Sequence, residues 1–311
     1  MISTTETQTG RRRCRRTEDQ WNGTRSKGWQ RDRVPKTGRS GSPDVVILAS
    51  VVLTTAELEG FDELGFVWLR GAFTADQAAA MRAVVWRELA RRYGIQEQDP
   101  ATWSPTRPSG LKNSKRHRVF DPIGGTALTE AADSLLGKGC WPMPRQWGPV
   151  LVTFPFPGEP WVLPHRVWHV DFRYDNRAEP LFGLKLFALF GDAGPQGGGT
   201  LLVSRSHRLV ARFVATQPDE VRSDFRRTRL RFMSHDPVLK DLARPGPEPG
   251  RRERFMDNDH DVDGIAIRVI ELTGHAGDVV LTHPWTLHHV APNASMQPRF
   301  MRAQSIYRAA Q

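Results

Sequence analysis

The pattern of apolar positions predicts two helices around a short strand at the start of the folded region. Thr54–Glu57 and Thr74–Gln77 each pair a threonine with an acid or amide three residues on, which is the spacing of a helix-capping box. Between them, Gly65–Arg70 has the apolar and aromatic residues of a strand. We expect the second helix to end before Gly94, and its apolar residues recur at helical spacing at Met81, Val84, Val85 and Leu89.

From position 150 onward the apolar residues come instead in short runs of four to eight residues. Gly- and Pro-rich stretches such as Asp192–Gly199 separate these runs, which predict strands. Helices first and many strands later predict a mainly β fold with flanking helices, and a double-sheet jelly roll is the form that closes around a ligand. The predicted strands are Val150–Phe154, Leu184–Phe190, Thr200–Val203, Ile265–Leu272, Asp278–Thr282 and Arg302–Tyr307.

Residues 210–264 interrupt this rhythm of strands. They are rich in charge, and Arg244–Gly250 contains three prolines, which exclude a continuous helix or a central strand there. We interpret the segment as a partly helical insertion and a candidate lid over a site, with a disordered insert as the alternative. The expected organisation is a basic tail over residues 1–43 and a jelly-roll domain over residues 44–311.

The positive charge of the chain is concentrated in its first residues. The formal net charge is +10, and residues 1–42 hold eleven Lys or Arg against four Asp or Glu. The remaining 33 basic and 30 acidic residues leave a balance of only +3. With few apolar residues and the arginine-rich run Arg11–Arg16, the tail is expected to be disordered. An arm for nucleic acid or an anionic surface and a merely solvated leader are both compatible with this composition.

The same region carries no signal for a membrane or for secretion. No long apolar run follows the basic residues, and Val45–Leu53 is too short to span a bilayer. The chain has two cysteines, Cys14 and Cys140, which do not suit a disulfide framework. We therefore expect a cytoplasmic protein with no membrane partner.

The first residues that point to chemistry are His169 and Asp171, in the sequence Trp-His-Val-Asp. Alternate residues of an extended segment point to the same side, so both side chains can reach one metal ion. A chain of this composition contains roughly 0.6 such pairs by chance, so the pair alone is weak evidence. It needs a third ligand from elsewhere in the chain.

His288, in Leu-His-His-Val-Ala-Pro-Asn, can supply that third ligand. His283 and His289 are alternatives, although alternation along a strand places His288 and His289 on opposite faces. Two imidazoles and one carboxylate on one side of an iron ion form the facial triad of non-haem Fe(II) oxygenases. The sequence therefore points to an oxygenase.

Arg299 follows His288 by eleven positions and suits an acidic co-substrate. A guanidinium binds a carboxylate through two parallel hydrogen bonds, which a lysine does not reproduce. Arg302 and Arg308 are alternatives. In a strand, Arg299 would share a face with Met301, while Arg302 would lie on the other face.

With these residues in place, most of the sequence from about position 54 resembles the phytanoyl-CoA dioxygenase family of Fe(II)- and 2-oxoglutarate-dependent oxygenases. Phe61–Phe73 is similar to the opening helix and strand of the family, and Trp168–Asp171 to its first iron motif. Gly197–His207 resembles its Gly-x-Leu-x-Val-x-Pro-Gly-Ser-His hairpin, with Ser-Arg in place of Pro-Gly. Gly277–Arg299 resembles its second iron block.

The resemblance implies a double-stranded β-helix of the cupin-like jelly-roll type, with iron held by His169, Asp171 and His288. It further implies that Arg299 binds the remote carboxylate of 2-oxoglutarate and that His207 is another co-substrate contact. The implied reaction consumes O2 and 2-oxoglutarate, hydroxylates a small organic substrate, and releases succinate and CO2.

Two other functions could use the same residues. A nucleic-acid demethylase would need a base-flipping pocket and a basic groove, and the +3 balance outside the tail argues against nucleic acid as a partner. A non-catalytic jelly-roll binding protein would not need a complete triad together with Arg299. We therefore expect a small-molecule substrate, whose identity the sequence does not give.

Overall fold

The computed structural model describes residues 52–103, 108, 111, 117–156, 158, 160–246 and 248–309. The predicted tail over residues 1–43 lies outside these described residues. The described part opens with helix α1 (Thr55–Leu64), strand β1 (Phe66–Leu69) and helix α2 (Ala75–Tyr93). This order of elements is the one that the apolar pattern predicts.

The ends of both helices follow from local sequence. The hydroxyls of Thr54 and Thr74 each accept a hydrogen bond from the backbone N–H three residues on, and both capping boxes are complete. Gly65 and Gly94 end the helices in the left-handed conformation, with φ of 86° and 68°. The predicted end of α2 before Gly94 is confirmed.

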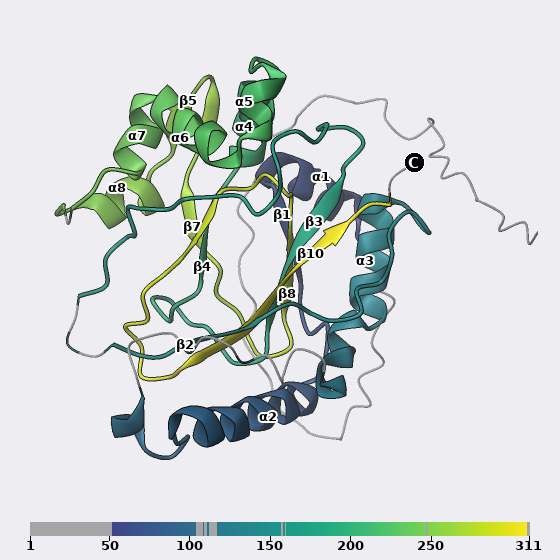
Figure 1. The fold of residues 1–311 in the computed structure, drawn as a ribbon, viewed down its shortest axis with the longest axis vertical. Helices are drawn as coiled ribbons and strands as arrows, with labels where there is room; N and C mark the ends of the chain where they lie inside the picture. The colour runs from purple at the N-terminus through teal and green to yellow at the C-terminus, as the bar shows by residue number, and fades with distance from the viewer. Residues whose placement is uncertain are drawn as a thin grey trace, which may run out of the picture.

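Two antiparallel sheets form the centre of the fold (Figure 1). The larger sheet has the strand order β1-β8-β3-β10-β2, and the smaller has the order β7-β4-β9. This arrangement is the predicted double-stranded β-helix, mainly β with flanking helices. The remaining strands are β2 (Val150–Thr153), β3 (Gly183–Leu189), β4 (Thr200–Val203), β7 (Val269–Glu271), β8 (Val279–Thr282), β9 (His288–Val290) and β10 (Arg299–Tyr307).

The strand predicted over Ile265–Leu272 is in fact two strands that belong to different sheets. Its first part, β6 (Ile265–Ile267), pairs with β5 (His260–Val262), and its second part is β7. Arg268 separates them because its backbone carbonyl accepts from the backbone N–H of Ser204 at 2.8 Å and its N–H donates to the Ser204 hydroxyl at 3.1 Å. The Ser204 hydroxyl therefore accepts the hydrogen bond that a backbone carbonyl would accept in a continuous strand.

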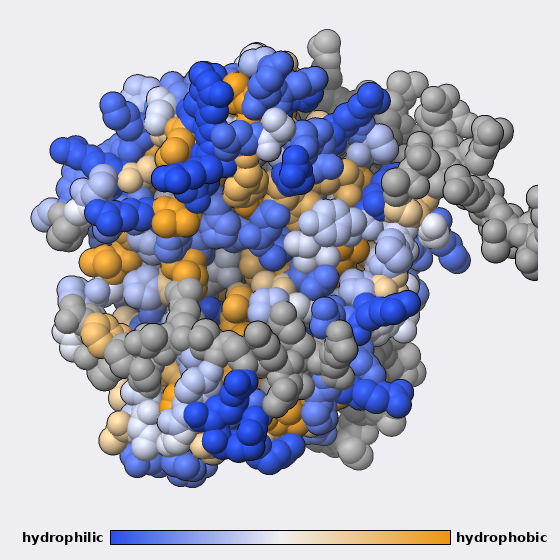
Figure 2. All heavy atoms as spheres, in the orientation of Figure 1, coloured by the Kyte–Doolittle hydropathy of each residue, from blue (hydrophilic) through white to orange (hydrophobic). Residues whose placement is uncertain are grey.

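Five helices lie between β4 and β5 in the chain and cover the outer side of the smaller sheet (Figure 1). They overlap most of the segment predicted to be a partly helical insertion, although the first begins four residues earlier. Their outer surface, at the upper end of the view, is largely hydrophilic (Figure 2). The helices are α4 (Ser206–Ala215), α5 (Asp219–Ser223), α6 (Phe225–His235), α7 (Pro237–Leu242) and α8 (Arg251–Asp257).

Other helical elements cover the opposite side of the molecule, on the outer face of the larger sheet. Besides α2, they include the 3-10 segment η4 (Arg118–Gly124) and α3 (Thr126–Leu136), which the sequence reading did not assign. Phe300 of β10 packs with these elements, whereas Met301 packs between the two sheets. The interior of the jelly roll is therefore lined by every second residue of each strand.

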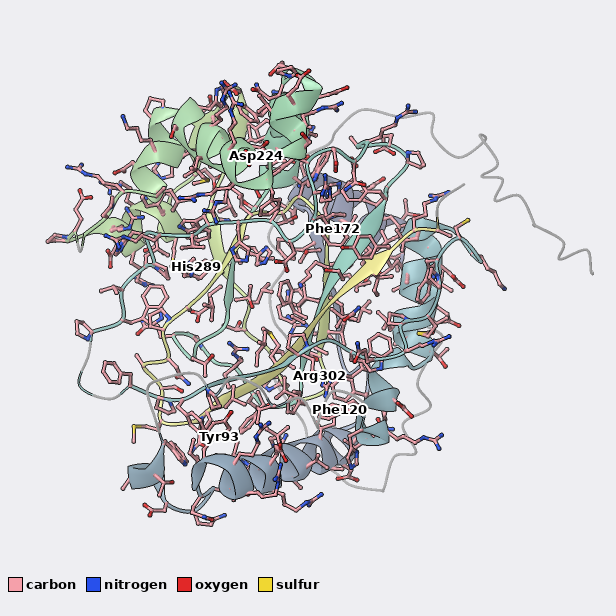
Figure 3. All side chains as sticks on the ribbon, in the orientation of Figure 1. Tyr93, Phe120, Phe172, Asp224, His289 and Arg302 are labelled. Atoms are coloured by element: carbon pink, nitrogen blue, oxygen red, sulfur yellow. The ribbon has the colours of Figure 1, made fainter. Side chains whose placement is uncertain are left out.

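Arg302 illustrates this alternation. Its side chain lies on the outer face of β10, where the guanidinium stacks on Phe120 at 3.6 Å from the ring centre (Figure 3). It also donates to the backbone carbonyl of Gly148 at 2.8 Å. The predicted separation of Arg302 from Arg299 and Met301 is confirmed.

No helix in the part of the chain that the structure describes is long and apolar enough to cross a membrane. Cys140 is buried. The other cysteine of the sequence, Cys14, lies outside the described residues.

Candidate metal centre

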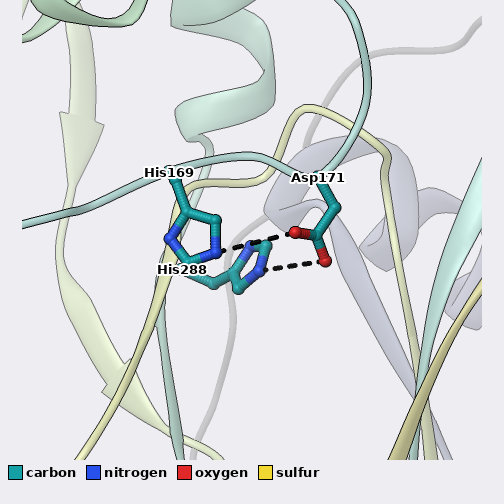
Figure 4. Close-up of side chains that lie close together, drawn as sticks. All are labelled: His169, Asp171 and His288. Atoms are coloured by element: carbon teal, nitrogen blue, oxygen red, sulfur yellow. Dashed lines mark ion pairs between the residues drawn. The ribbon is translucent and has the colours of Figure 1, made fainter. Parts of the chain in front are cut away.

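The three predicted metal ligands meet at one edge of the smaller sheet. His169 and His288 form an antiparallel bridge, in which each backbone N–H donates to the carbonyl of the other residue, at 3.3 and 2.9 Å. This bridge extends the sheet by one short strand beyond β9. Asp171 follows His169 by two residues, so its side chain points to the same side (Figure 4).

The ligand atoms converge closely enough for a single ion. The Nε2 atom of His169 lies 3.6 Å from Asp171 Oδ1, and the Nε2 atom of His288 lies 3.5 Å from Asp171 Oδ2 (Figure 4). One ligand atom from each of the three residues lies within 4.8 Å of the others. Ligands at right angles around an ion, with bonds of about 2.1 Å, are about 3 Å apart. A small inward movement of the side chains would complete the geometry.

Backbone carbonyls fix both rings in the orientation that a metal site requires. The Nδ1 atom of His169 is 2.8 Å from the carbonyl oxygen of Val167, and that of His288 is 3.1 Å from the carbonyl oxygen of Thr286. A carbonyl only accepts, so each Nδ1 carries the proton and each Nε2 keeps its lone pair for a metal.

Val167 adopts an unusual backbone conformation to make its contact. Its φ is +63°, in the left-handed region that β-branched residues rarely enter, at a cost of about 1–3 kcal/mol. Its carbonyl nevertheless receives the His169 ring. Strain next to a candidate site is consistent with local geometry selected for the site rather than for stability.

The charges of the three side chains also fit a metal ion. Burial lowers the pKa of His169 to about 4, with a further lowering from His288, so the ring is neutral at neutral pH. Burial acts to raise the pKa of Asp171, but His288 and Lys185 outweigh it, and the pKa lies well below its usual range. A neutral imidazole and a carboxylate are the forms in which these residues bind metals.

Sequence reasoning missed Lys185 of β3. Its side chain is buried and its Nζ forms an ion pair with Asp171 Oδ2. The signal in the sequence is the single charged residue inside the otherwise apolar strand Gly183–Leu189. A buried charge in such a strand needs a partner, and the strand pattern alone does not say which one.

Arg299 lies at the start of β10, in the interior of the jelly roll and only 1% exposed. Its Nε donates to the carbonyl of Gly198 at 2.8 Å, and its Nη2 donates to the hydroxyl of Thr153 at 2.6 Å. These contacts hold the guanidinium rigidly on the same face of β10 as Met301. The structure brings together the three metal ligands and leaves Arg299 outside their immediate contacts.

The other histidines that the sequence offers as site residues lie elsewhere. His207, in the first turn of α4, has its Nε2 atom 2.9 Å from the carbonyl of Asp62 in α1. Its ring is 4.8 Å from that of His283, which is half-buried. His289 points away from His288, and its ring lies 5.6 Å from that of Trp168. None of the three belongs to the cluster of ligand atoms around Asp171 in the described structure.

Comparison with known proteins agrees with this picture. The family model of the phytanoyl-CoA dioxygenases matches residues 61–301. Among solved structures, the chain is similar to the non-haem alpha-ketoglutarate-dependent carbocyclase SnoK from nogalamycin biosynthesis, at 17% identity, with 83% of this chain and 85% of that chain covered and a TM-score of 0.46. No curated protein matches the sequence significantly.

Two further structures show similar values. HygX from Streptomyces hygroscopicus, solved with nickel and 2-oxoglutarate bound, is 15% identical over 83% of this chain and 88% of that chain, with a TM-score of 0.45. EctD from S. alaskensis is 17% identical over 84% and 79%, with a TM-score of 0.46. Since the family model spans well over half of the sequence, the chain belongs to the phytanoyl-CoA dioxygenase family.

Proposed function

We propose that the protein is an Fe(II)- and 2-oxoglutarate-dependent dioxygenase that hydroxylates a small organic substrate with release of succinate and CO2. The observation that carries this proposal is the convergence of two imidazoles and one carboxylate within 4.8 Å. Membership of a family of iron- and 2-oxoglutarate-dependent oxygenases supports it.

In this proposal His169, Asp171 and His288 hold the iron. Bound iron supplies O2 activation, which no amino-acid side chain provides. The carbonyls of Val167 and Thr286 keep both Nε2 lone pairs directed at the ion. Asp171 gives the ion a third protein ligand and leaves no protein-side position for a halide, which favours hydroxylation over halogenation.

Arg299 binds the far carboxylate of 2-oxoglutarate in the same proposal. Its guanidinium is buried, where charge-assisted hydrogen bonds are strongest, and it is already held by Gly198 and Thr153. The Thr153 hydroxyl, which accepts from Arg299, can donate its own hydrogen to the same carboxylate. His207 stays a prediction as a further co-substrate contact.

The reaction can be tested by following 2-oxoglutarate consumption and succinate formation by NMR, with Fe(II), O2 and ascorbate present. We expect succinate from the wild type and none from His288→Ala, because that variant lacks one metal ligand. His275→Ala is the matched control, since the His275 side chain is 88% exposed. If the metal-loaded wild type forms no succinate on prolonged incubation, the proposal is wrong, and a non-catalytic binding protein becomes the favoured function.

A further inference from the structure

The interior of the jelly roll holds a second cation besides Arg299. On β3, Leu184 and Leu186 pack on the outer, helix-covered side, whereas Phe187 lies between the two sheets. Lys185 shares the inner face with Phe187 and is 9% exposed. Its ammonium lies on this inner face, where it forms an ion pair with the carboxylate of Asp171.

The other buried charges of the described residues have partners or positions outside the interior of the jelly roll. Glu88 pairs with Arg91 on α2, and Asp278 pairs with Arg70. Arg251 donates to backbone carbonyls of α7, and Arg302 lies on the outer face of β10. Lys185 and Arg299 are thus the two buried cations that face the interior within the described structure.

A buried hydroxyl next to Lys185 has no hydrogen-bond partner among the described residues. Thr282 of β8 is the cross-strand neighbour of Lys185 and, like Val280, faces the interior. The residue is 1% exposed, and its Oγ1 makes no hydrogen bond in the described structure. A buried polar atom without a partner costs about 1–3 kcal/mol, so a partner delivered by a ligand is a direct explanation.

The charge balance of the loaded site points to the nature of that ligand. This step rests on the proposed function. Iron contributes two positive charges and Lys185 and Arg299 one each, while Asp171 contributes one negative charge and 2-oxoglutarate two. One positive charge is left in excess. An uncompensated charge in a partly buried site is costly, and an anion removes the cost.

We propose that Lys185 and Thr282 form an oxyanion pocket for an acidic group of the primary substrate, so that the enzyme acts on a carboxylate, phosphate or sulfate. The ammonium supplies the charge, and the hydroxyl donates a hydrogen bond to the same group. Lys185 thereby places the substrate next to Asp171 and the iron.

The surface near Asp171 suits the approach of an anion. The ring of Phe225, at the start of α6, lies 5.2 Å from that of Tyr174, three residues after Asp171. Helix α6 carries four arginines and no acidic residue. Such a positive field raises the rate at which anions arrive, in a salt-dependent manner.

The test uses trifluoroacetate as a probe and trifluoroethanol as its neutral counterpart. Both are titrated under anaerobic conditions into protein loaded with Fe(II) and saturated with 2-oxoglutarate, and the 19F linewidth reports proximity to the paramagnetic ion. We expect saturable broadening of trifluoroacetate and none of trifluoroethanol. Equal broadening of the two probes in the wild type overturns the proposal, whatever the variants do.

Variants assign the effect to the pocket. We expect Lys185→Met to weaken trifluoroacetate binding at least tenfold, Lys185→Arg to retain it in part, and Thr282→Val, which keeps the shape, to weaken it several-fold. Lys138→Met is the matched control, since Lys138 is exposed and lies after α3. Undiminished binding in both Lys185→Met and Thr282→Val overturns the proposal.

Two further outcomes have separate signatures. If Lys185→Met needs at least tenfold more 2-oxoglutarate to form the visible charge-transfer band but binds trifluoroacetate normally, Lys185 serves the co-substrate and the proposal is wrong. If the wild type forms no such band, the proposed function itself fails. Mn(II) affinity, measured by electron paramagnetic resonance, is expected to remain within threefold of wild type in Lys185→Met, because the ligands are intact. A loss of Mn(II) binding would instead make Lys185 a support for Asp171 and overturn its assignment to the substrate.

Discussion

His207, which is buried in the first turn of α4 and contacts the carbonyl of Asp62 in α1, should make the fold sensitive to mild acid. Burial lowers the pKa of His207 from its ordinary 6.5 to about 4. The unfolded chain therefore takes up a proton at a higher pH than the folded chain, and the free energy of unfolding falls as the pH drops from about 6.5 to about 4. This loss is about 2 kcal/mol at pH 5 and about 3 kcal/mol when complete.

Urea denaturation at pH 7 and pH 5 measures this loss directly. His207→Gln removes the titration and keeps an N–H that can donate to the Asp62 carbonyl. We expect the drop in unfolding free energy between the two pH values to shrink by about 2 kcal/mol in this variant. His275→Gln, at an exposed position, is the control.

An identical pH dependence in His207→Gln and the wild type would refute this reasoning. The same variant also tests the predicted role of His207 in the site. A structural role leaves the affinity for 2-oxoglutarate unchanged, whereas a direct contact with the co-substrate predicts a clear loss of affinity.

Further predictions concern the site and its frame. Arg299→Lys should weaken 2-oxoglutarate binding at least tenfold, with unchanged Mn(II) affinity, because lysine cannot make two parallel hydrogen bonds; calorimetry separates the two affinities. Asp171→Asn should lower Mn(II) affinity more than a hundredfold in electron paramagnetic resonance titrations, since a ligand charge is lost. Mn(II) binding should weaken as the pH falls towards 4, where protons compete for His169; an affinity that stays unchanged between pH 7 and pH 4 would contradict the assignment of His169 as a ligand. Gly277→Ala should destabilise the fold by about 1–3 kcal/mol in urea, because φ is +109° and a Cβ would lie 2.3 Å from the carbonyl oxygen of Phe73.

The sequence was sufficient for the helices and strands whose signals are local. The capping boxes at Thr54 and Thr74 and the glycine at position 94 act within one turn of the chain, so they could be recognised without tertiary information. Long apolar runs such as β3 were equally clear. The break at Arg268 was missed because it depends on Ser204, which is 64 residues away in the sequence.

The residues of the candidate site also fall into two groups, those that the sequence could identify and those that it could not. His169 and Asp171 could be paired from their spacing, and His288 from its distance in sequence to Arg299. Lys185 and Thr282 could not be found, because a lone polar residue in an apolar strand acquires meaning only through its neighbours across the sheet. The sequence did not predict strand β9, because β9 has only three residues and its formation depends on pairing with β4.

The most direct test of the account is an anaerobic titration of the metal-free protein with Fe(II) and then 2-oxoglutarate, watching for the visible metal-to-ligand charge-transfer band. We predict a band in the wild type, no band in His169→Ala, and a band in Arg299→Lys that requires at least tenfold more 2-oxoglutarate. A folded, iron-loaded wild-type protein that shows no band at saturating 2-oxoglutarate would contradict the claim that His169, Asp171 and His288 form an oxygenase centre.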